Sequence, residues 1–128
     1  MAEALSVLVV DDEPIVGKRL GPALTRDGYE VEVCQSGQEA VDHINARRFD
    51  IVVTDVRMED VDGLKVLEHV IKKSPQTKVI IITGYATIEM AREALAKGAF
   101  DFIAKPFKPQ ELRVILARAA RALAEEAC

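Results

Sequence analysis

The chain has 128 residues, of which 49% are hydrophobic and 30% are charged, and this composition is typical of one folded globular domain. Its formal net charge is −4, and aromatic residues make up only 5% of it. Nucleic-acid binding requires a basic surface and often aromatic rings for base stacking, so we expect no direct binding of nucleic acid.

The sequence also argues against export and against membrane insertion. Its first residues lack the basic and apolar regions of a signal peptide, and its apolar runs are far shorter than the roughly 20 residues that span a bilayer. Cys34 and Cys128 form neither a CxxC motif nor a Cys/His cluster, which argues against a redox motif, a zinc site or a disulfide framework. We therefore expect a cytoplasmic protein without membrane contact.

Five short apolar runs follow one another along the chain. They lie at Val7–Val10, Val31–Cys34, Ile51–Thr54, Val79–Thr83 and Phe102–Ala104. Runs of this length, rich in β-branched residues, are typical of β-strands. Because successive positions are apolar, the pattern predicts strands that are buried on both faces.

Each run is followed by a stretch with helical periodicity. Pro14 suits the first turn of the first helix, Ser36-Gly37-Gln38-Glu39 forms a capping box before the second, and Gly63 precedes the third. Thr87 is the expected N-cap of the fourth helix, and the fifth is predicted from Pro109 to about Glu126. Five strand–helix units indicate an α/β domain with a parallel sheet and helices on both faces. Without linkers or repeats, residues 1–128 are expected to form a single domain.

Parallel sheets of this kind bind ligands beyond the carboxyl ends of their strands. Asp11 and Asp12 follow the first strand, Asp55 follows the third, Thr83 ends the fourth and Lys105 follows the fifth. Three carboxylates at one edge would repel one another, and a divalent cation would relieve that repulsion. Oxygen ligands and water are typical of Mg²⁺, and Lys105 and Thr83 are suited to donate to a phosphoryl group beside it.

Each of these residues also has a simpler explanation when it is taken alone. Asp11 or Asp12 suits a helix N-cap before Pro14, Lys105 suits a surface salt bridge, and Thr83 suits a strand end. The joint arrangement is what favours a metal-assisted phosphoryl site.

The chain closely resembles the receiver domain of two-component response regulators from Leu5 to about Leu123. Four strings carry the resemblance: Val9–Pro14, Val53–Met58, Ile82–Gly84 and Ala104–Phe107. The segments Asp55–Met58 and Gly98–Phe107 are most similar to receivers of the NtrC and DctD type, which precede an ATPase module and a DNA-binding module. The resemblance implies a flavodoxin-like (βα)5 fold, a doubly wound parallel sheet of five strands in the order 2-1-3-4-5.

The resemblance also implies a role for each residue of the acidic group. Asp55 would accept a phosphoryl group from a sensor histidine kinase. Asp12 and Asp55 would bind Mg²⁺ directly, Asp11 would bind it through water, and the backbone carbonyl of Arg57 would complete the ligands. Such a domain catalyses its own Mg²⁺-dependent phosphorylation and slow dephosphorylation, and it is a signalling switch rather than an enzyme.

The remaining residues would transmit the signal. Lys105 would pair with the phosphoryl group and Thr83 would be drawn toward it, while Phe102 matches the family's switch aromatic or is a simple core residue. The fourth helix, fifth strand and fifth helix would form the surface that contacts an output domain or partner protein and that self-associates. The implied role is in transcriptional regulation.

Two other functions are possible on a similar sheet but fit less well. A phosphatase of the haloacid dehalogenase type requires a second Asp two residues after its nucleophile, where Arg57 stands. A flavin protein of the flavodoxin type requires a hydroxyl- and glycine-rich phosphate loop after the first strand, where Asp11-Asp12-Glu13 would repel a phosphate.

One departure from the receiver pattern is Glu59, which replaces the usual Pro after Met58 and makes the loop after the third strand acidic.

The last helix is longer than packing on the sheet requires. Leu112, Ile115, Leu116 and Ala119 form the stripe that would face the sheet. Ala122, Leu123 and Ala124 continue beyond it and are expected not to reach the sheet, so they form either a frayed end or an overhang that pairs with a second copy. We expect a weak two-fold dimer that phosphorylation tightens or rearranges.

Overall fold

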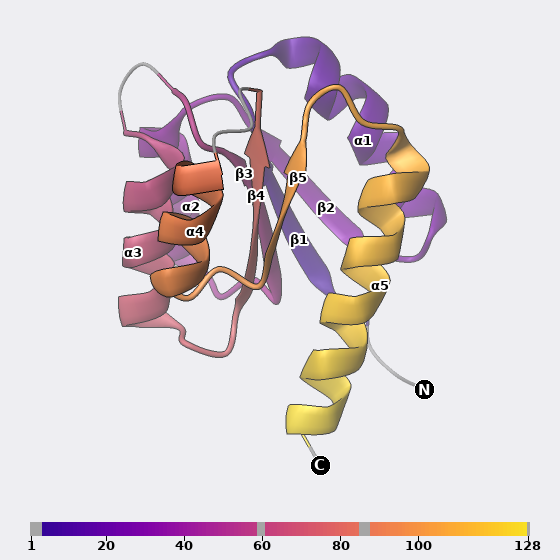
Figure 1. Ribbon diagram of the computed structural model, residues 1–128. Coiled ribbons are helices and arrows are strands. Elements are labelled where there is room, and N and C mark those ends of the chain that lie inside the picture. Colours follow the sequence, from indigo (N-terminus) through magenta and orange to yellow (C-terminus); the bar gives the residue numbers. More distant parts are fainter. Residues whose placement is uncertain (1–3, 59–60, 85–87, 128) are drawn as a thin grey trace.

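A computed structural model describes residues 4–58, 61–84 and 88–127 of the chain. Five strands alternate with five helices, as predicted (Figure 1). The strands are β1 (Ser6–Val10), β2 (Glu30–Cys34), β3 (Ile51–Asp55), β4 (Lys78–Thr83) and β5 (Asp101–Ala104). The helices are α1 (Pro14–Arg26), α2 (Gly37–Ala46), α3 (Gly63–Lys73), α4 (Ile88–Ala96) and α5 (Pro109–Glu126). Glu59 and the expected cap Thr87 lie outside the described residues.

All strand pairs are parallel, and the strand order is β2-β1-β3-β4-β5, which confirms the predicted fold. Helices α1 and α5 cover one face of the sheet, and α2, α3 and α4 cover the other (Figure 1). Alternate residues of β1 show how this works, because Leu8 belongs to the core under α2 and α3 while Val7 and Val9 belong to the core under α1 and α5. Each face of the sheet thus packs against helices through its own hydrophobic core.

The prediction that all five strands are buried on both faces is wrong for β2 and β5. β1 and β3 are fully buried, but Val33 of β2 is 41% exposed and Phe102 of β5 is 36% exposed. Both strands lie at the edges of the sheet, where a helix layer does not cover every residue. The alternative that Phe102 is a simple core residue is therefore wrong as well.

The structure assigns the helix starts to particular residues. Ser36 Oγ accepts a hydrogen bond from the Glu39 backbone N–H at 3.0 Å, which confirms the predicted N-cap of α2. Asp62, which the sequence did not single out, caps α3 by accepting from Lys65 N at 2.9 Å. The N-cap position of α1 is occupied by Glu13, so the reading of Asp11 or Asp12 as that cap is wrong.

Helix α5 has the predicted bounds, and its last turns extend past the edge of the sheet (Figure 1), with residues 124–127 exposed. Leu123 is partly buried and packs against the core under α1 and α5, contrary to expectation. Glu126 forms an ion pair with Lys78 at the start of β4. No described helix combines the length and the hydrophobicity that a bilayer-crossing segment requires.

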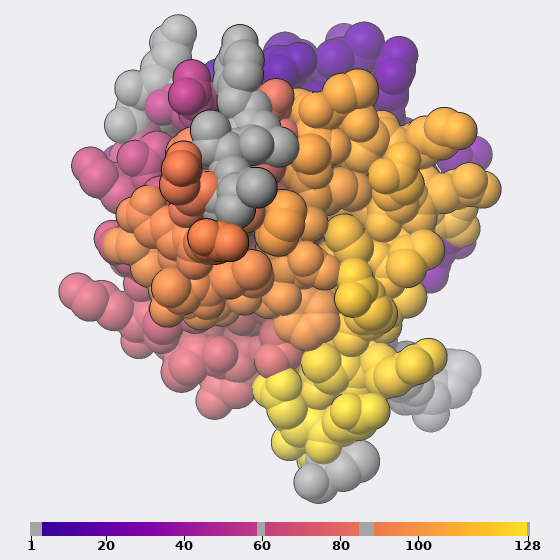
Figure 2. Space-filling view, in the orientation of Figure 1, coloured from indigo at the N-terminus to yellow at the C-terminus, as the bar shows by residue number. Residues whose placement is uncertain are grey.

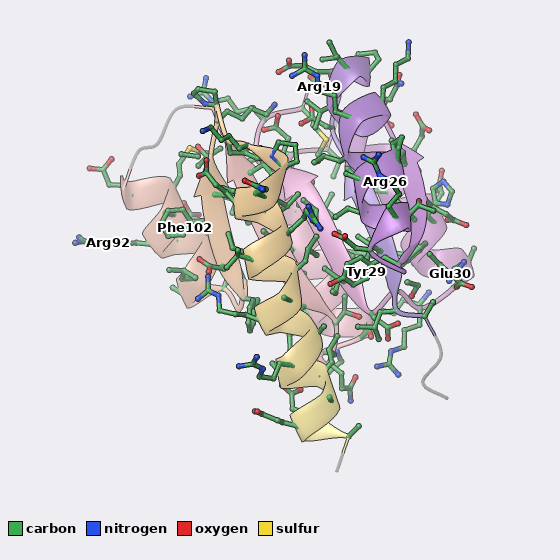
Figure 3. The ribbon with its side chains drawn as sticks, turned by 90° about the vertical axis from the view of Figure 1, so that its right-hand side faces the viewer. Arg19, Arg26, Tyr29, Glu30, Arg92 and Phe102 are labelled. Carbon is green, nitrogen blue, oxygen red and sulfur yellow. The ribbon has the colours of Figure 1, made fainter. Side chains whose placement is uncertain are left out.

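The α4–β5–α5 surface, coloured orange to yellow, faces the viewer in Figure 2. Among its described residues, Leu95 is 42% exposed, Phe102 is 36% exposed and Val114 is 61% exposed. Phe102 is labelled in Figure 3. Exposed apolar side chains on neighbouring elements are a feature of protein contact surfaces.

Candidate functional site

The strand register places the predicted site residues at one edge of the sheet. Val10 pairs with Thr54, Asp55 with Ile82, and Thr83 with Ala104, so β1, β3, β4 and β5 all end at the same level. Asp11, Asp12 and Lys105 directly follow β1 and β5 at this edge. The structure therefore brings together the groups that the sequence predicted.

Four carboxylates form the acidic cluster: Asp11, Asp12, Glu13 and Asp55. Each contributes one oxygen, and these oxygens lie within 4.8 Å of one another. Asp11 and Asp55 are buried, whereas Asp12 and Glu13 are exposed. Glu13 was read in the sequence only as part of the strand end, because its proximity to Asp55 depends on the turn into α1.

Lys105 is the cation at the centre of this cluster. Its Nζ lies 2.8 Å from Asp55 Oδ2, 3.0 Å from Asp11 Oδ2 and 3.0 Å from Glu13 Oε1. Burial alone lowers the pKa of Lys105, but the hydrogen bonds to these three carboxylates outweigh it and raise the pKa above its ordinary value. One ammonium therefore faces four carboxylates, and the site retains an excess of negative charge.

Asp11 is the most buried member of the cluster. Its Oδ1 accepts a hydrogen bond from the Glu13 backbone N–H at 2.9 Å, while its buried Oδ2 receives no well-directed hydrogen bond within the described residues, although Lys105 Nζ is 3.0 Å away. Burial raises the pKa of Asp11, against the lowering effects of the Glu13 N–H and Lys105. A buried carboxylate oxygen whose one nearby donor is the shared Lys105 ammonium, beside three further carboxylates, fits an oxygen-ligated cation such as Mg²⁺.

Both oxygens of Asp55 are oriented by neighbouring donors. Oδ1 accepts from the Arg57 backbone N–H at 3.0 Å, and Oδ2 accepts from Lys105 Nζ at 2.8 Å. The following loop is held in turn, because Gly63 N–H donates to the Val56 carbonyl at 2.9 Å. A Cβ at Gly63 would overlap the Asp55 carbonyl oxygen and the Val56 Cα, so α3 begins in direct contact with the backbone at the end of β3.

Thr83 is buried at the end of β4, next to the site. Its carbonyl accepts a hydrogen bond from the Lys105 backbone N–H at 2.8 Å, which joins the ends of β4 and β5. Phe102 lies three residues before Lys105 on β5, and its side chain is exposed. Thr83 and Lys105 thus belong to the site, whereas Phe102 belongs to the outer surface.

Comparisons with known proteins point to one family. The family model described as "Response regulator receiver domain" matches residues 7–117. Regulatory protein AtoC of Escherichia coli (strain K12) is 39% identical over 113 residues, covering 88% of this chain and 24% of that protein. Nitrogen assimilation regulatory protein NtrX of Azorhizobium caulinodans is 34% identical over 122 residues, covering 94% and 27%. The chain thus spans about a quarter of the length of these curated relatives.

Solved structures show the same fold. NtrX from Brucella abortus superposes with a TM-score of 0.90 at 32% identity, covering 97% of this chain and 28% of that one. The signal receiver domain of a LuxO repressor protein from Vibrio parahaemolyticus, described as putative, superposes with a TM-score of 0.90 at 25% identity, covering 97% and 96%.

Proposed function

This chain belongs to the response regulator receiver domain family of two-component systems, with NtrC-like relatives, and we propose that Asp55 is its phosphoryl acceptor. The observation that carries the proposal is the 2.8 Å contact between Lys105 Nζ and Asp55 Oδ2 within a cluster of four acids. Asp55 is buried at the strand end, and both of its oxygens are held by donors. An oriented carboxylate beside a fixed cation is suited to nucleophilic attack on phosphorus.

In the proposed reaction, a carboxylate oxygen of Asp55 attacks the phosphorus of a phosphohistidine. The phosphorus–nitrogen bond breaks, the imidazole leaves, and the new phosphorus–oxygen bond gives an acyl phosphate on Asp55. The Lys105 ammonium stabilises negative charge on the phosphoryl oxygens, because it already lies at hydrogen-bond distance from the acceptor. Water later hydrolyses the acyl phosphate and restores the carboxylate.

Mg²⁺ is the cofactor that we assign to this site. Asp12 and Asp55 would hold it directly, Asp11 through water, and the Arg57 carbonyl would complete the protein ligands. Bound there, Mg²⁺ supplies positive charge that offsets the charge of the phosphoryl oxygens. Without it, the cluster has more negative charge than Lys105 alone neutralises.

The proposed signal is a shift between two conformations. The phosphoryl group would gain hydrogen bonds to Thr83 and Lys105 only in the active one, and this difference in affinity sets the size of the shift. We propose a cytoplasmic sensor histidine kinase as the donor and an output domain or partner of transcriptional regulation as the target. The α4–β5–α5 surface, with Phe102 exposed on it, is the proposed contact for the target and for a second copy.

Intact-mass spectrometry after incubation with acetyl phosphate and Mg²⁺ tests the acceptor. The wild-type chain should gain one phosphoryl group, and Asp55→Asn should gain none. Asp42→Asn is the matched control, since Asp42 is an exposed acid on α2 that contacts only Gln38 among the described residues. Labelling of Asp55→Asn at the wild-type level would refute the assignment.

A further inference from the structure

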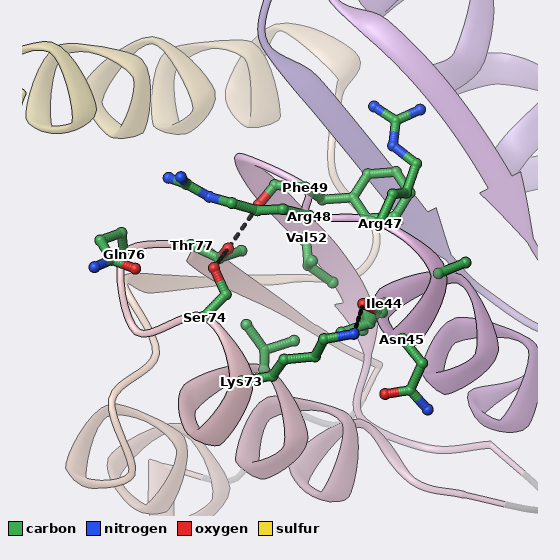
Figure 4. A pocket seen from close by; sticks show the side chains of 12 residues that line it. Ile44, Asn45, Arg47, Arg48, Phe49, Val52, Lys73, Ser74, Gln76 and Thr77 are labelled. Atoms are coloured by element: carbon green, nitrogen blue, oxygen red, sulfur yellow. Dashed lines mark hydrogen bonds between the residues drawn. The ribbon is translucent and has the colours of Figure 1, made fainter.

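A pocket lies at the amino ends of the strands, opposite the end of the sheet that carries the acidic cluster (Figure 4). It is formed where β3 and β4 begin and where α2 and α3 end, and its volume is about 330 Å³. None of the residues proposed for phosphorylation lines it. Any function of this pocket is therefore separate from the phosphoryl chemistry.

The pocket combines apolar walls with basic side chains. Phe49 and Val52 line it and are buried, and Arg47, Arg48 and Lys73 line it with exposed side chains. None of the described lining residues is acidic, although the whole chain has 21 acidic and only 17 basic residues. A cavity of this size with apolar walls and a few polar groups has the usual features of a small-molecule site, and its charge selects for an anion.

Two of the three cations have a structural role that needs no ligand. Lys73 Nζ donates to the Ile44 carbonyl near the end of α2 at 2.8 Å. The Arg47 guanidinium lies 4.7 Å from the centroid of the Phe49 ring and 3.4 Å from Glu32. Basic side chains are common at helix C-termini, so these two alone would not indicate a binding site.

Arg48 is different. It lies beyond the end of α2, its side chain is exposed, and the described part of the chain offers it no hydrogen-bond or ion-pair partner. Figure 4 shows its side chain extending away from Arg47, on the side of the pocket where Gln76 and Thr77 lie. Arg48 therefore carries a guanidinium at the pocket that is available to an anion.

The wall beside Arg48 is held in place by hydrogen bonds. Thr77 is buried, and its Oγ1 donates to the Phe49 carbonyl at 2.6 Å. The hydroxyl groups of Ser74 and Thr77 are 2.8 Å apart. These contacts join the segment before β4 to the segment before β3, so the pocket is formed before a ligand binds. Binding therefore requires little loss of conformational entropy in the pocket wall.

We propose that this pocket binds a small organic anion, with a carboxylate or phosphate group on Arg48 and an apolar body against Phe49. Guanidinium groups bind such anions through paired hydrogen bonds. For a compound with a single ring and a single charge, one exposed ion pair and a small apolar contact give a Kd on the order of millimolar.

Four small molecules that differ in ring and charge test the proposal on the full chain, with binding followed by amide chemical shifts. Benzoate carries both features, acetate has the charge without the ring, benzamide has the ring without the charge, and benzylamine has the opposite charge. At constant ionic strength, benzoate should shift the amides of residues 44–49 and 73–77. It should bind at least about fivefold more tightly than benzamide and benzylamine, which cannot form the charge-assisted pair, and than acetate, which lacks the apolar contact with Phe49. Equal binding of benzamide or of acetate would overturn the proposal.

Arg48→Gln should weaken benzoate binding by about fivefold or more, since it removes one charge-assisted pair. The control is Arg26→Gln, because Arg26 is an exposed arginine at the end of α1 (Figure 3) and does not line the pocket. It should bind benzoate like wild type. An unchanged Kd in Arg48→Gln would refute the site. An equal loss of affinity in Arg26→Gln would also refute it, because binding would then depend only on the net charge of the chain. Amide shifts away from the pocket report whether each variant keeps the fold.

Discussion

Removing the charge of Asp12 should stabilise the metal-free domain. The four carboxylates of the cluster approach one another within 4.8 Å, and Lys105 is the one cation that contacts them among the described residues. Asp12 is exposed, and Lys105 contacts the other three acids. Asp12→Asn removes its negative charge and keeps the shape of the side chain, so it should relieve repulsion without creating a cavity.

The size of this effect follows from the distances. Two unit charges 4.8 Å apart repel by about 0.9 kcal/mol in water. Asp12 faces three like charges and one opposite charge, so roughly two such repulsions are relieved, and salt screening reduces the sum to about 1 kcal/mol. For a domain of this size, that corresponds to a rise in Tm of about 3–5 °C.

Thermal melts at pH 7 and about 0.1 M salt, with a chelator present, measure the change in Tm. The gain should shrink at about 1 M salt, where exposed charges are screened. With Mg²⁺ the order should reverse, because the wild-type chain gains stability by binding the ion and the variant has lost a ligand. Asp42→Asn is the control and should change Tm little under any of these conditions. A lower Tm of Asp12→Asn in chelator would refute the reasoning that the metal-free site is under electrostatic strain.

Three further predictions concern signalling, a buried thiol and self-association. Thr83→Ala should still be labelled on Asp55 but should lose the change in amide exchange of α4 that a phosphoryl mimic causes in wild type; a wild-type response would make Thr83 a structural residue only. Burial raises the pKa of the Cys34 thiol to about 12 from its ordinary value of 9.0. In a Cys128→Ser variant, alkylation at pH 8 should therefore be at least about a hundredfold slower in the folded chain than in urea, since the thiolate is the reacting form; comparable rates would contradict a buried Cys34. Sedimentation should show a weak dimer that the phosphoryl mimic strengthens and that Leu95→Lys or Val114→Lys weakens, because both side chains are exposed and apolar; wild type that stays monomeric at high concentration with the mimic would exclude it.

The sequence predicted the elements well because each has a local signal. Buried runs mark β1, β3 and β4, and Ser36 marks the start of α2. Burial at the sheet edges was missed, since edge position depends on strand order rather than on the composition of a strand. A signal was nonetheless visible in β2, where Glu30 and Glu32 alternate with valines in the manner of a strand with one exposed face.

The site was predictable in outline because parallel strands bring their carboxyl ends together. Asp11, Asp55, Thr83 and Lys105 needed only the strand register to become neighbours. The contact between Glu13 and Lys105 was not predictable, because it depends on the turn before α1 and on the rotamers of two long side chains. The packing of Leu123 could have been inferred from its place four residues after Ala119 on the buried stripe of α5.

The missing side chain at Gly63 has a consequence for how this surface can diverge between related proteins. Because α3 begins against the Asp55 carbonyl, backbone contact rather than loop side chains holds the acceptor in place. Exchanging an exposed loop residue such as Arg57 should therefore alter what an approaching kinase contacts and leave the proposed acceptor in place. A side chain at position 63 would instead push α3 away from β3 and displace Asp55 with it. In this chain, the residues that an approaching kinase contacts can therefore change without altering the proposed phosphoryl site, as long as residue 63 remains glycine.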